Sequence, residues 1–197
     1  MIAVIDYGAG NLQSVRNAFA RLDTPIQVVR DPEILRGASK VVLPGVGHFG
    51  QMTRALDELR LRDALLNRIS AGVPVLGICL GMQALYQTSE EAPDDEGLGV
   101  LTGRILRFGA GLRVPHMGWN HVEALTPSRL LANTGTAPYF YFANSFYAPV
   151  GADTAVTCTY GVALSAIVER ENVFGVQFHP EKSGMAGLRV LQNFVEL

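Results

Sequence analysis

The stretch that most constrains the fold is Val73–Gln83, which reads VPVLGICLGMQ. Its first four residues form a short apolar run without charge, which is typical of a buried parallel strand. Gly77 and Gly81 flank Cys79 two residues on either side, and the residues that follow favour a helix. A turn this tight between strand and helix leaves no room for a Cβ atom at the flanking positions and exposes the residue at its tip. The pattern predicts a nucleophile elbow with cysteine as the nucleophile.

The predicted elbow would also favour the anionic form of Cys79. It places the sulfur at a helix N-terminus, where unpaired N–H groups and the helix dipole stabilise a thiolate. The N–H group of Leu80 would then point toward an oxyanion formed by attack from Cys79. The alternative is a buried structural cysteine, because free cysteines are among the most buried residues in proteins.

The composition fits one globular domain that spans residues 1–197. Hydrophobic residues make up 48% of the 197 residues, which is enough to build a complete core, and charged residues make up 17%. The net charge of −2 gives no electrostatic basis for binding nucleic acid or an anionic membrane. No apolar run approaches the roughly 20 residues that a membrane-spanning helix needs.

The N-terminal sequence and the cysteines indicate a cytoplasmic protein. The chain begins MIAVIDYG, without the basic region of a signal peptide. The two cysteines, Cys79 and Cys158, are far apart in the sequence. We therefore expect free thiols in a reducing compartment rather than a disulfide.

Strand and helix patterns alternate through the first half of the chain. Strands are expected at 1–5, 26–29, 40–43 and 73–76, and helices at 11–22, from Asp31, and at 51–71 with a break near Arg60. This order predicts an α/β fold with a mostly parallel sheet and helices on both faces. The second half predicts an antiparallel extension of that sheet, with strands at 100–106, 121–124, 139–146, 155–160, 163–168 and 173–178 and a final helix at 185–195.

A second segment with candidate catalytic residues, His179-Pro180-Glu181, follows the last predicted strand. Open α/β sheets place their sites at the carboxyl ends of strands, so we expect His179 and Cys79 at one edge. A histidine beside a thiol can accept its proton and later protonate a leaving group. If the segment stays extended, Glu181 points the same way as His179 and can fix its tautomer. The alternative is a strand-end histidine with an exposed glutamate.

The loop 44–50, which reads PGVGHFG, follows the third predicted strand. Its glycines would let backbone N–H groups approach a small ligand. One of these groups would supply a second oxyanion donor, which is worth roughly 100- to 1,000-fold in rate. An ordinary turn between strand and helix is the alternative.

Taken together, GICLGMQ and FGVQFHPEKSG resemble the class I (triad-type) glutamine amidotransferases. The segments PGVGHFGQM, VPHMGWN and DYGAGNLQSV narrow the resemblance to the glutaminase subunits of imidazole glycerol phosphate synthase, over nearly the whole chain. The resemblance implies that Cys79 attacks the side-chain amide of glutamine, that His179 is the acid and base, and that Glu181 orients it. It implies glutamate and ammonia as products and no cofactor.

The resemblance also implies the residues that surround the substrate. The oxyanion donors would come from Val46 or Gly47 together with Leu80. Gln83 matches a glutamine-binding position. Glu91 and Ser145 are weaker matches to substrate contacts.

A cyclase subunit with a (β/α)8 barrel is the partner that the resemblance implies. It would use the ammonia to convert a phosphoribosyl-formimino nucleotide into imidazole glycerol phosphate and an aminoimidazole carboxamide ribotide. Ammonia is mostly protonated at neutral pH and is then no nucleophile, so an enclosed path between the subunits would keep it reactive. Asn11 and Trp119 are the candidates for the partner face, while a core or edge aromatic is the alternative for Trp119.

Two positions depart from the family pattern. Asn144-Ser145-Phe146 stands where relatives often carry histidine and then Ser-Tyr or Thr-Tyr, so one tyrosine hydroxyl is missing. His48 stands in the oxyanion loop where a small residue is more usual.

His116 and His121 have no acidic or cysteine neighbour at ligand spacing, and we expect no metal site.

Other functions stay open at this point. One is a related glutaminase, such as the subunit of pyridoxal phosphate synthase, or a cysteine hydrolase of the same superfamily. Another is a dinucleotide-binding module, because Gly8-Ala9-Gly10 follows a strand and opens a helix, and Asp31 ends the next strand about 20 residues later. The third glycine of that signature is absent, since Gln13 occupies its place.

Overall fold

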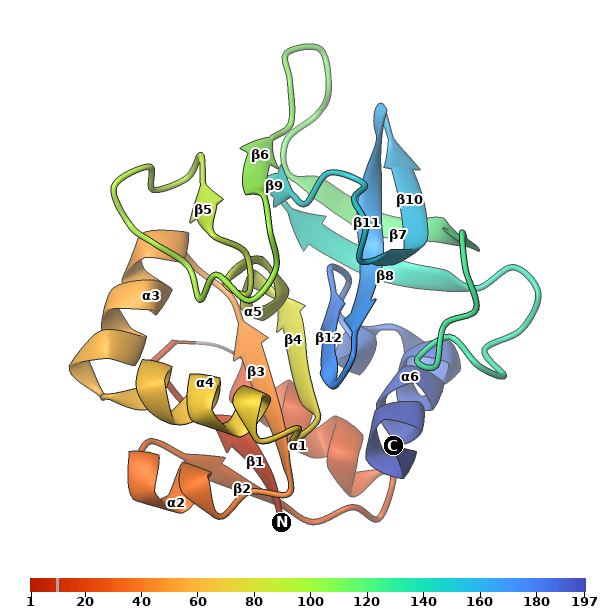
Figure 1. Cartoon of the computed structure of the whole chain (residues 1–197). Helices are drawn as coiled ribbons and strands as arrows, with labels where there is room; N and C mark the ends of the chain where they lie inside the picture. Colours follow the sequence, from red (N-terminus) through yellow and green to blue (C-terminus); the bar gives the residue numbers. More distant parts are fainter. Residues whose placement is uncertain (10) are drawn as a thin grey trace.

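A large sheet runs through the middle of the protein and carries helices on both faces (Figure 1). The structure, a computed structural model, describes residues 1–9 and 11–197. Gly10, which belongs to the dinucleotide-binding signature, lies outside the described residues. Among the described residues, nine strands form this sheet in the order β2-β1-β3-β4-β12-β11-β10-β7-β8.

One half of the sheet is parallel. Its strands are β1 (Ile2–Ile5), β2 (Ile26–Val29), β3 (Lys40–Gly45), β4 (Val75–Cys79) and β12 (Val173–Val176). The register places Gly45 of β3 beside Cys79 of β4, and Val176 of β12 beside Ile78. The carboxyl ends of these three strands therefore lie side by side at one edge of the sheet.

The other half is antiparallel, as the sequence predicts. It contains β11 (Val162–Arg170), β10 (Thr154–Tyr160), β7 (His116–Ala124) and β8 (Tyr139–Asn144). Each of these strands runs opposite to its neighbours. The short strands β5 (Thr88–Ser89), β6 (Arg104–Arg107) and β9 (Phe146–Tyr147) form a separate small sheet.

Helices cover both faces of the parallel half. On one face lie α2 (Pro32–Arg36), α3 (Phe49–Glu58) and α4 (Leu61–Ser70), and on the other lie α1 (Leu12–Ala20) and α6 (Gly184–Glu196). Alternate residues of β3 divide between two hydrophobic cores. Leu43 packs with the α2–α4 side, and its neighbour Val42 packs with the α1–α6 side. β3 is therefore buried on both faces, which explains its apolar sequence after Lys40.

The helix ends follow the predicted signals. The Asn11 side chain accepts a hydrogen bond from the N–H of Ser14 at the start of α1. The Asp31 side chain accepts one from the N–H of Glu33 at the start of α2. Asp31 therefore serves as a helix cap and not as the ribose-binding acid of a dinucleotide site. The predicted break in the long helix falls at Arg60, whose φ of 56° separates α3 from α4.

Several boundaries differ from the predictions. The strand predicted at 73–76 begins at Val75 and continues to Cys79, and the following helix α5 (Leu80–Gln83) has only four residues. β7 starts at His116 instead of 121, because its polar first half pairs residue by residue with β8. The strand predicted at 100–106 begins only at Arg104 and ends at Arg107, as β6. Of the described helices, none combines the length and the apolar character that crossing a membrane requires.

Candidate active site

Cys79 stands at the tip of a tight turn, as predicted. It ends β4 with φ 54° and ψ −110°, a conformation that non-glycine residues rarely adopt. A Cβ atom on Gly77 would come within 2.6 Å of the Gly81 carbonyl oxygen, and one on Gly81 would overlap the Leu43 carbonyl oxygen. Both glycines are therefore required by close backbone approach. Such local strain is frequent at reactive centres, where the surrounding structure holds it in place.

β12 brings His179 to the edge where Cys79 lies. The N–H of His179 donates to the carbonyl oxygen of Tyr141 at 2.8 Å, which attaches the segment to β8. Its Nδ1 lies 2.8 Å from Oε1 of Glu181, and the two side chains are only 4% and 3% exposed. The segment does not stay extended, because Pro180–Lys182 forms a 3-10 turn, η1. This turn brings the Glu181 carboxylate into contact with the ring, so the expected contact is present although the backbone is not extended. The alternative of an exposed glutamate was wrong.

The electrostatic surroundings of His179 favour its protonated form. Burial by itself lowers the pKa of an imidazole. The hydrogen bonds of His179 with Cys79 and Glu181 outweigh that effect and raise its pKa to about 10. The ring is thus held between a sulfur and a carboxylate, and it can keep a proton near neutral pH for delivery to another group.

A cavity of about 280 Å³ opens in front of the cysteine. The predicted site residues that line it are Val46, Gly47, Cys79, Leu80, Gln83, Glu91, Ser145 and His179. Glu181 lies behind the histidine ring and does not line the cavity. Lys182, which sequence analysis missed, adds a cation to the wall. Its position directly after the His-Pro-Glu segment was the signal that could have identified it.

Val46, one of the predicted oxyanion donors, is engaged by Tyr7. The N–H of Val46 donates to the Tyr7 hydroxyl at 3.1 Å, and that hydroxyl donates to the Val46 carbonyl at 2.9 Å. Burial raises the pKa of Tyr7 to about 12, so its hydroxyl stays protonated and can make both bonds. Sequence analysis missed Tyr7, although it follows β1 at the same edge of the sheet.

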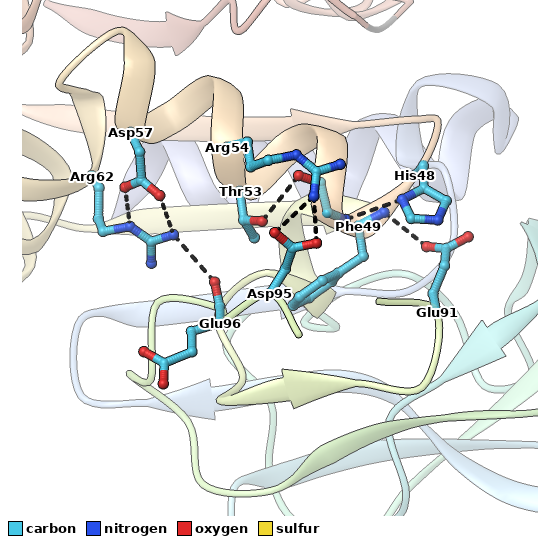
Figure 2. A network of polar contacts seen from close by, with 10 residues as sticks. His48, Phe49, Thr53, Arg54, Asp57, Arg62, Glu91, Asp95 and Glu96 are labelled. Carbon is cyan, nitrogen blue, oxygen red and sulfur yellow. Dashed lines mark hydrogen bonds and ion pairs between the residues drawn. The ribbon is translucent and has the colours of Figure 1, made fainter. Parts of the chain in front are cut away.

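Glu91 joins the oxyanion loop to the segment 88–97. Its Oε2 accepts from the N–H of Phe49 at 2.8 Å, at the first residue of α3 (Figure 2). His48 caps the same helix, because its Nδ1 accepts from the N–H of Gly50 at 3.2 Å. The unusual histidine in this loop therefore has a structural role. A carboxylate at a helix N-terminus is also electrostatically favourable.

Two arginines, one on α3 and one on α4, hold the same segment against these helices (Figure 2). Arg54 donates to both carboxylate oxygens of Asp95, at 2.8 and 2.6 Å. Arg62 pairs with Asp57 and donates to the carbonyl oxygens of Glu96 and Gly97. These contacts fix the wall of the cavity to which Glu91 belongs.

Behind the cysteine lies a chain of buried amide groups. Gln83 Nε2 donates to the Phe146 carbonyl at 2.9 Å and to Gln177 Oε1 at 3.0 Å. Gln177 Nε2 in turn donates to the Cys79 sulfur at 3.7 Å. Asn144 also donates to the Phe146 carbonyl, at 2.9 Å. Sequence analysis did not single out Gln177, although it is a polar residue inside an otherwise apolar run and stands two positions before His179.

The two predicted partner residues have different surroundings. Trp119 is 56% exposed on β7, and Met117 beside it is 63% exposed, so the core alternative for Trp119 was wrong. The register pairs Trp119 with Tyr141 and Met117 with Ala143 of β8, and Ala143 lines the cavity. This outer face of β7 and β8 thus reaches the cavity rim. Asn11 is exposed, and its side chain caps α1.

The two other histidines have separate environments. His116 is buried and stacks on Phe142 and Tyr160, with ring centroids 4.9 and 4.0 Å apart. Burial lowers the pKa of His116 to about 4. His121 lies on β7 near Glu123 at 3.9 Å. Across the residues that the structure describes, no group of three or more His, Cys, Asp or Glu side chains could hold a metal ion.

The fold and the site define a class of protein that comparison with known proteins also identifies. The family model for glutamine amidotransferase class-I matches residues 3–197. The chain therefore belongs to the class I glutamine amidotransferases. A crystal structure of a glutamine amidotransferase superposes with a TM-score of 0.79 at 22% identity, covering 100% of this chain and 98% of that one, which supports the same fold.

Curated relatives identify the particular group within this class. "Imidazole glycerol phosphate synthase subunit HisH" of Methanothermobacter thermautotrophicus is 48% identical over 198 residues, covering 100% of this chain and 98% of the relative. The protein of the same name from Moorella thermoacetica is 46% identical, covering 100% and 94%. At this identity and coverage, the chain is a member of the HisH family.

Proposed function

We propose that this protein hydrolyses glutamine to glutamate and ammonia, and that it delivers the ammonia to the cyclase subunit of imidazole glycerol phosphate synthase in histidine biosynthesis. The observation that carries the proposal is the meeting of Cys79, His179 and Glu181 at the ends of adjacent strands, beside one cavity. The HisH names of the relatives support the reaction and the pathway. Residues 1–197 act as one domain, and the enzyme works in the cytoplasm.

The reaction begins when the Cys79 sulfur, having passed its proton to His179, attacks the side-chain amide carbon of glutamine. The C–N bond then breaks, and the leaving nitrogen takes the proton from His179 and departs as ammonia. Water gives a proton to His179 and attacks the glutamyl thioester. The C–S bond breaks, glutamate leaves, and the sulfur recovers its proton. Throughout, Glu181 holds the ring in the tautomer that both transfers require.

The negative oxygen of each tetrahedral intermediate needs backbone donors. The N–H of Leu80, at the start of α5, is one of them. The N–H of Val46 or that of Gly47 supplies the other. Because Tyr7 engages the N–H of Val46, this group can act as a donor only when that hydrogen bond breaks.

The cavity wall has the charges that an amino acid requires. Glu91 is the acceptor for the α-ammonium group of glutamine, and Lys182 is the cation for its α-carboxylate. Gln83 keeps its Oε1 as an acceptor, because its nitrogen is used by two internal partners. Ser145 contributes polar groups to the cavity lining.

The outer face of β7 and β8 is the surface that meets the cyclase. Trp119 and Met117 form an exposed apolar patch on this face, which is typical of an interface centre. Ala143 connects this patch to the cavity, so a partner placed there would cover the cavity mouth and exclude water from the ammonia path. Asn11 contributes at the start of α1.

The test is glutamine hydrolysis measured with and without the purified cyclase. Wild-type protein is expected to release glutamate and ammonia in equal amounts, and Cys79→Ser is expected to lose turnover. A Cys79→Ala variant as active as the wild type would disprove the proposal. Co-purification with a synthase barrel of the pyridoxal phosphate pathway, and not with the cyclase, would favour the related glutaminase instead.

A further inference from the structure

We propose that Gln177 is a further catalytic residue of this site, whose side-chain amide stabilises negative charge on the Cys79 sulfur while Gln83 holds that amide in position. The proposal deepens the proposed function and rests on it, because it assumes that the sulfur is the nucleophile. It assigns a chemical role to a residue that lies outside the triad, the oxyanion loop and the cavity wall.

The sheet places Gln177 beside the cysteine. β12 and β4 are parallel neighbours in which Val176 pairs with Ile78, so the next residue of each strand lies side by side at the sheet edge. Gln177 is completely buried, and its N–H donates to the carbonyl oxygen of Ala166 at 2.9 Å. Its Nε2 lies 3.7 Å from the Cys79 sulfur, which is within the range of an N–H···S hydrogen bond.

The partners of Gln83 determine which end of the Gln177 amide faces the sulfur. The carbonyl oxygen of Phe146 can only accept, so the nitrogen of the Gln83 amide must face it. The same nitrogen meets Gln177 at 3.0 Å, and Gln177 therefore presents its oxygen to Gln83. Its NH2 group is left facing Cys79. Without the sulfur as acceptor, part of a fully buried donor would lose its partner, which is costly.

An amide donor suits a thiolate better than a thiol. Hydrogen bonds to an ionised acceptor are about twice as strong as those between neutral groups. The donor therefore favours loss of the sulfur proton before attack. It also favours departure of the sulfur from the thioester, since a stabilised thiolate is the better leaving group. Gln177 thus acts in both halves of the reaction.

The contribution of Gln177 differs from that of the titratable groups near the sulfur. His179 approaches from the end of β12 and Tyr7 from the end of β1, while Glu91 and Lys182 line the cavity and Glu181 lies behind His179. Each of these groups is ionisable. An amide is not, so the Gln177 donor is present at every pH, and its loss removes this stabilisation of the anion throughout.

The experiment measures alkylation of Cys79 by iodoacetamide against pH, followed by intact mass in a Cys158→Ala background without glutamine. For Gln177→Leu we expect the apparent pKa of the reacting thiol to rise by about one unit, which is about tenfold slower alkylation below the transition and equal rates above it. Gln177→Glu keeps the size but places a carboxylate beside the sulfur, so the shift should be larger. Gln83→Leu should shift the profile in the same direction by less.

Gln27→Leu is the matched control, because it makes the same chemical change on an exposed position of the edge strand β2. Its profile should equal that of the wild type. A Gln177→Leu profile that superposes on the wild type would overturn the proposal, and if that variant fails to fold, an unshifted Gln177→Glu profile would do the same. Failure of wild-type Cys79 to react at any pH would instead count against the proposed function, so the two failures are distinguishable.

Discussion

The parallel and antiparallel halves of the sheet contribute to the site in different ways. In the parallel half, the central strands β3, β4 and β12 are buried on both faces, and their ends supply Cys79, His179 and the oxyanion loop. In the antiparallel half, β7 and β8 bury one face and expose Met117 and Trp119 on the other. The comparison teaches that the parallel half of the fold fixes the positions of the catalytic residues, while the antiparallel half forms a cavity wall and an apolar surface for a partner.

The largest expected effect is on the triad of the parallel half. Glu181→Gln keeps the size of the side chain but removes the charge beside His179 Nδ1, so the ring loses its preferred tautomer and the support for its proton. We expect a loss of roughly 10³- to 10⁴-fold in the rate of glutamine hydrolysis, with little change in cyclase binding. Steady-state kinetics and a binding titration measure the two effects. Glu196→Gln, near the exposed end of α6, is the control, and equal losses in both variants would contradict the assignment.

The next effect tests how tightly the parallel half is packed. A Cβ atom at Gly81 would overlap the backbone of β3, which cannot move without disturbing the sheet. We expect Gly81→Ala to reduce the free energy of unfolding by about 3 kcal/mol or more. Gly151→Ala, where a Cβ atom meets nothing within 4 Å, should change it by less than about 0.5 kcal/mol. Denaturant titration measures both, and similar values for the two variants would show that the elbow is not sterically constrained.

A third prediction concerns the buried face of the antiparallel half. The pKa of His116 is lowered from 6.5 to about 4 by burial, so the unfolded chain binds the proton more readily than the folded one. Its contribution to stability is complete above pH 6.5 and is lost as the pH falls toward 4, by roughly 3 kcal/mol in total. His116→Phe can still stack on Phe142 and Tyr160, and it should lose this part of the pH dependence. The free energy of unfolding is measured at pH 7 and at pH 4 for the wild type and for His116→Phe. A loss of stability between the two pH values that is as large in the variant as in the wild type would contradict the prediction.

The smallest effect is expected on the exposed face of the antiparallel half. Trp119→Ala removes the largest apolar side chain of the proposed cyclase surface without touching the buried core. We expect cyclase affinity to fall by about 2 kcal/mol, or about 30-fold, because central tryptophans carry much of the binding energy of interfaces. The free energy of unfolding should be unchanged. Leu125→Ala, at an exposed leucine beyond the end of β7, is the control. If the Trp119→Ala variant binds the cyclase as tightly as the Leu125→Ala variant, the interface does not include Trp119.

Much of the fold was predictable because local signals and the global arrangement agree. The apolar runs of β1 to β4, the caps at Asn11 and Asp31, and the break at Arg60 each depend on a few neighbouring residues. The boundaries in the second half were less predictable. The polar start of β7 becomes a strand only because β8 pairs with it, and no local pattern records such a partner.

The residues of the site likewise fall into those that the local sequence predicts and those that depend on the tertiary structure. By itself, the sequence determined that Cys79 occupies a glycine-flanked elbow and that His179 and Glu181 follow a strand, because these depend on steric limits and on short spacing. Only the tertiary structure decided that the carboxylate returns through a 3-10 turn, that Tyr7 engages Val46, and that Gln83 and Gln177 extend behind the sulfur. Those contacts join residues up to nearly a hundred positions apart, and their geometry is set by the order of strands in the sheet, which no local segment contains.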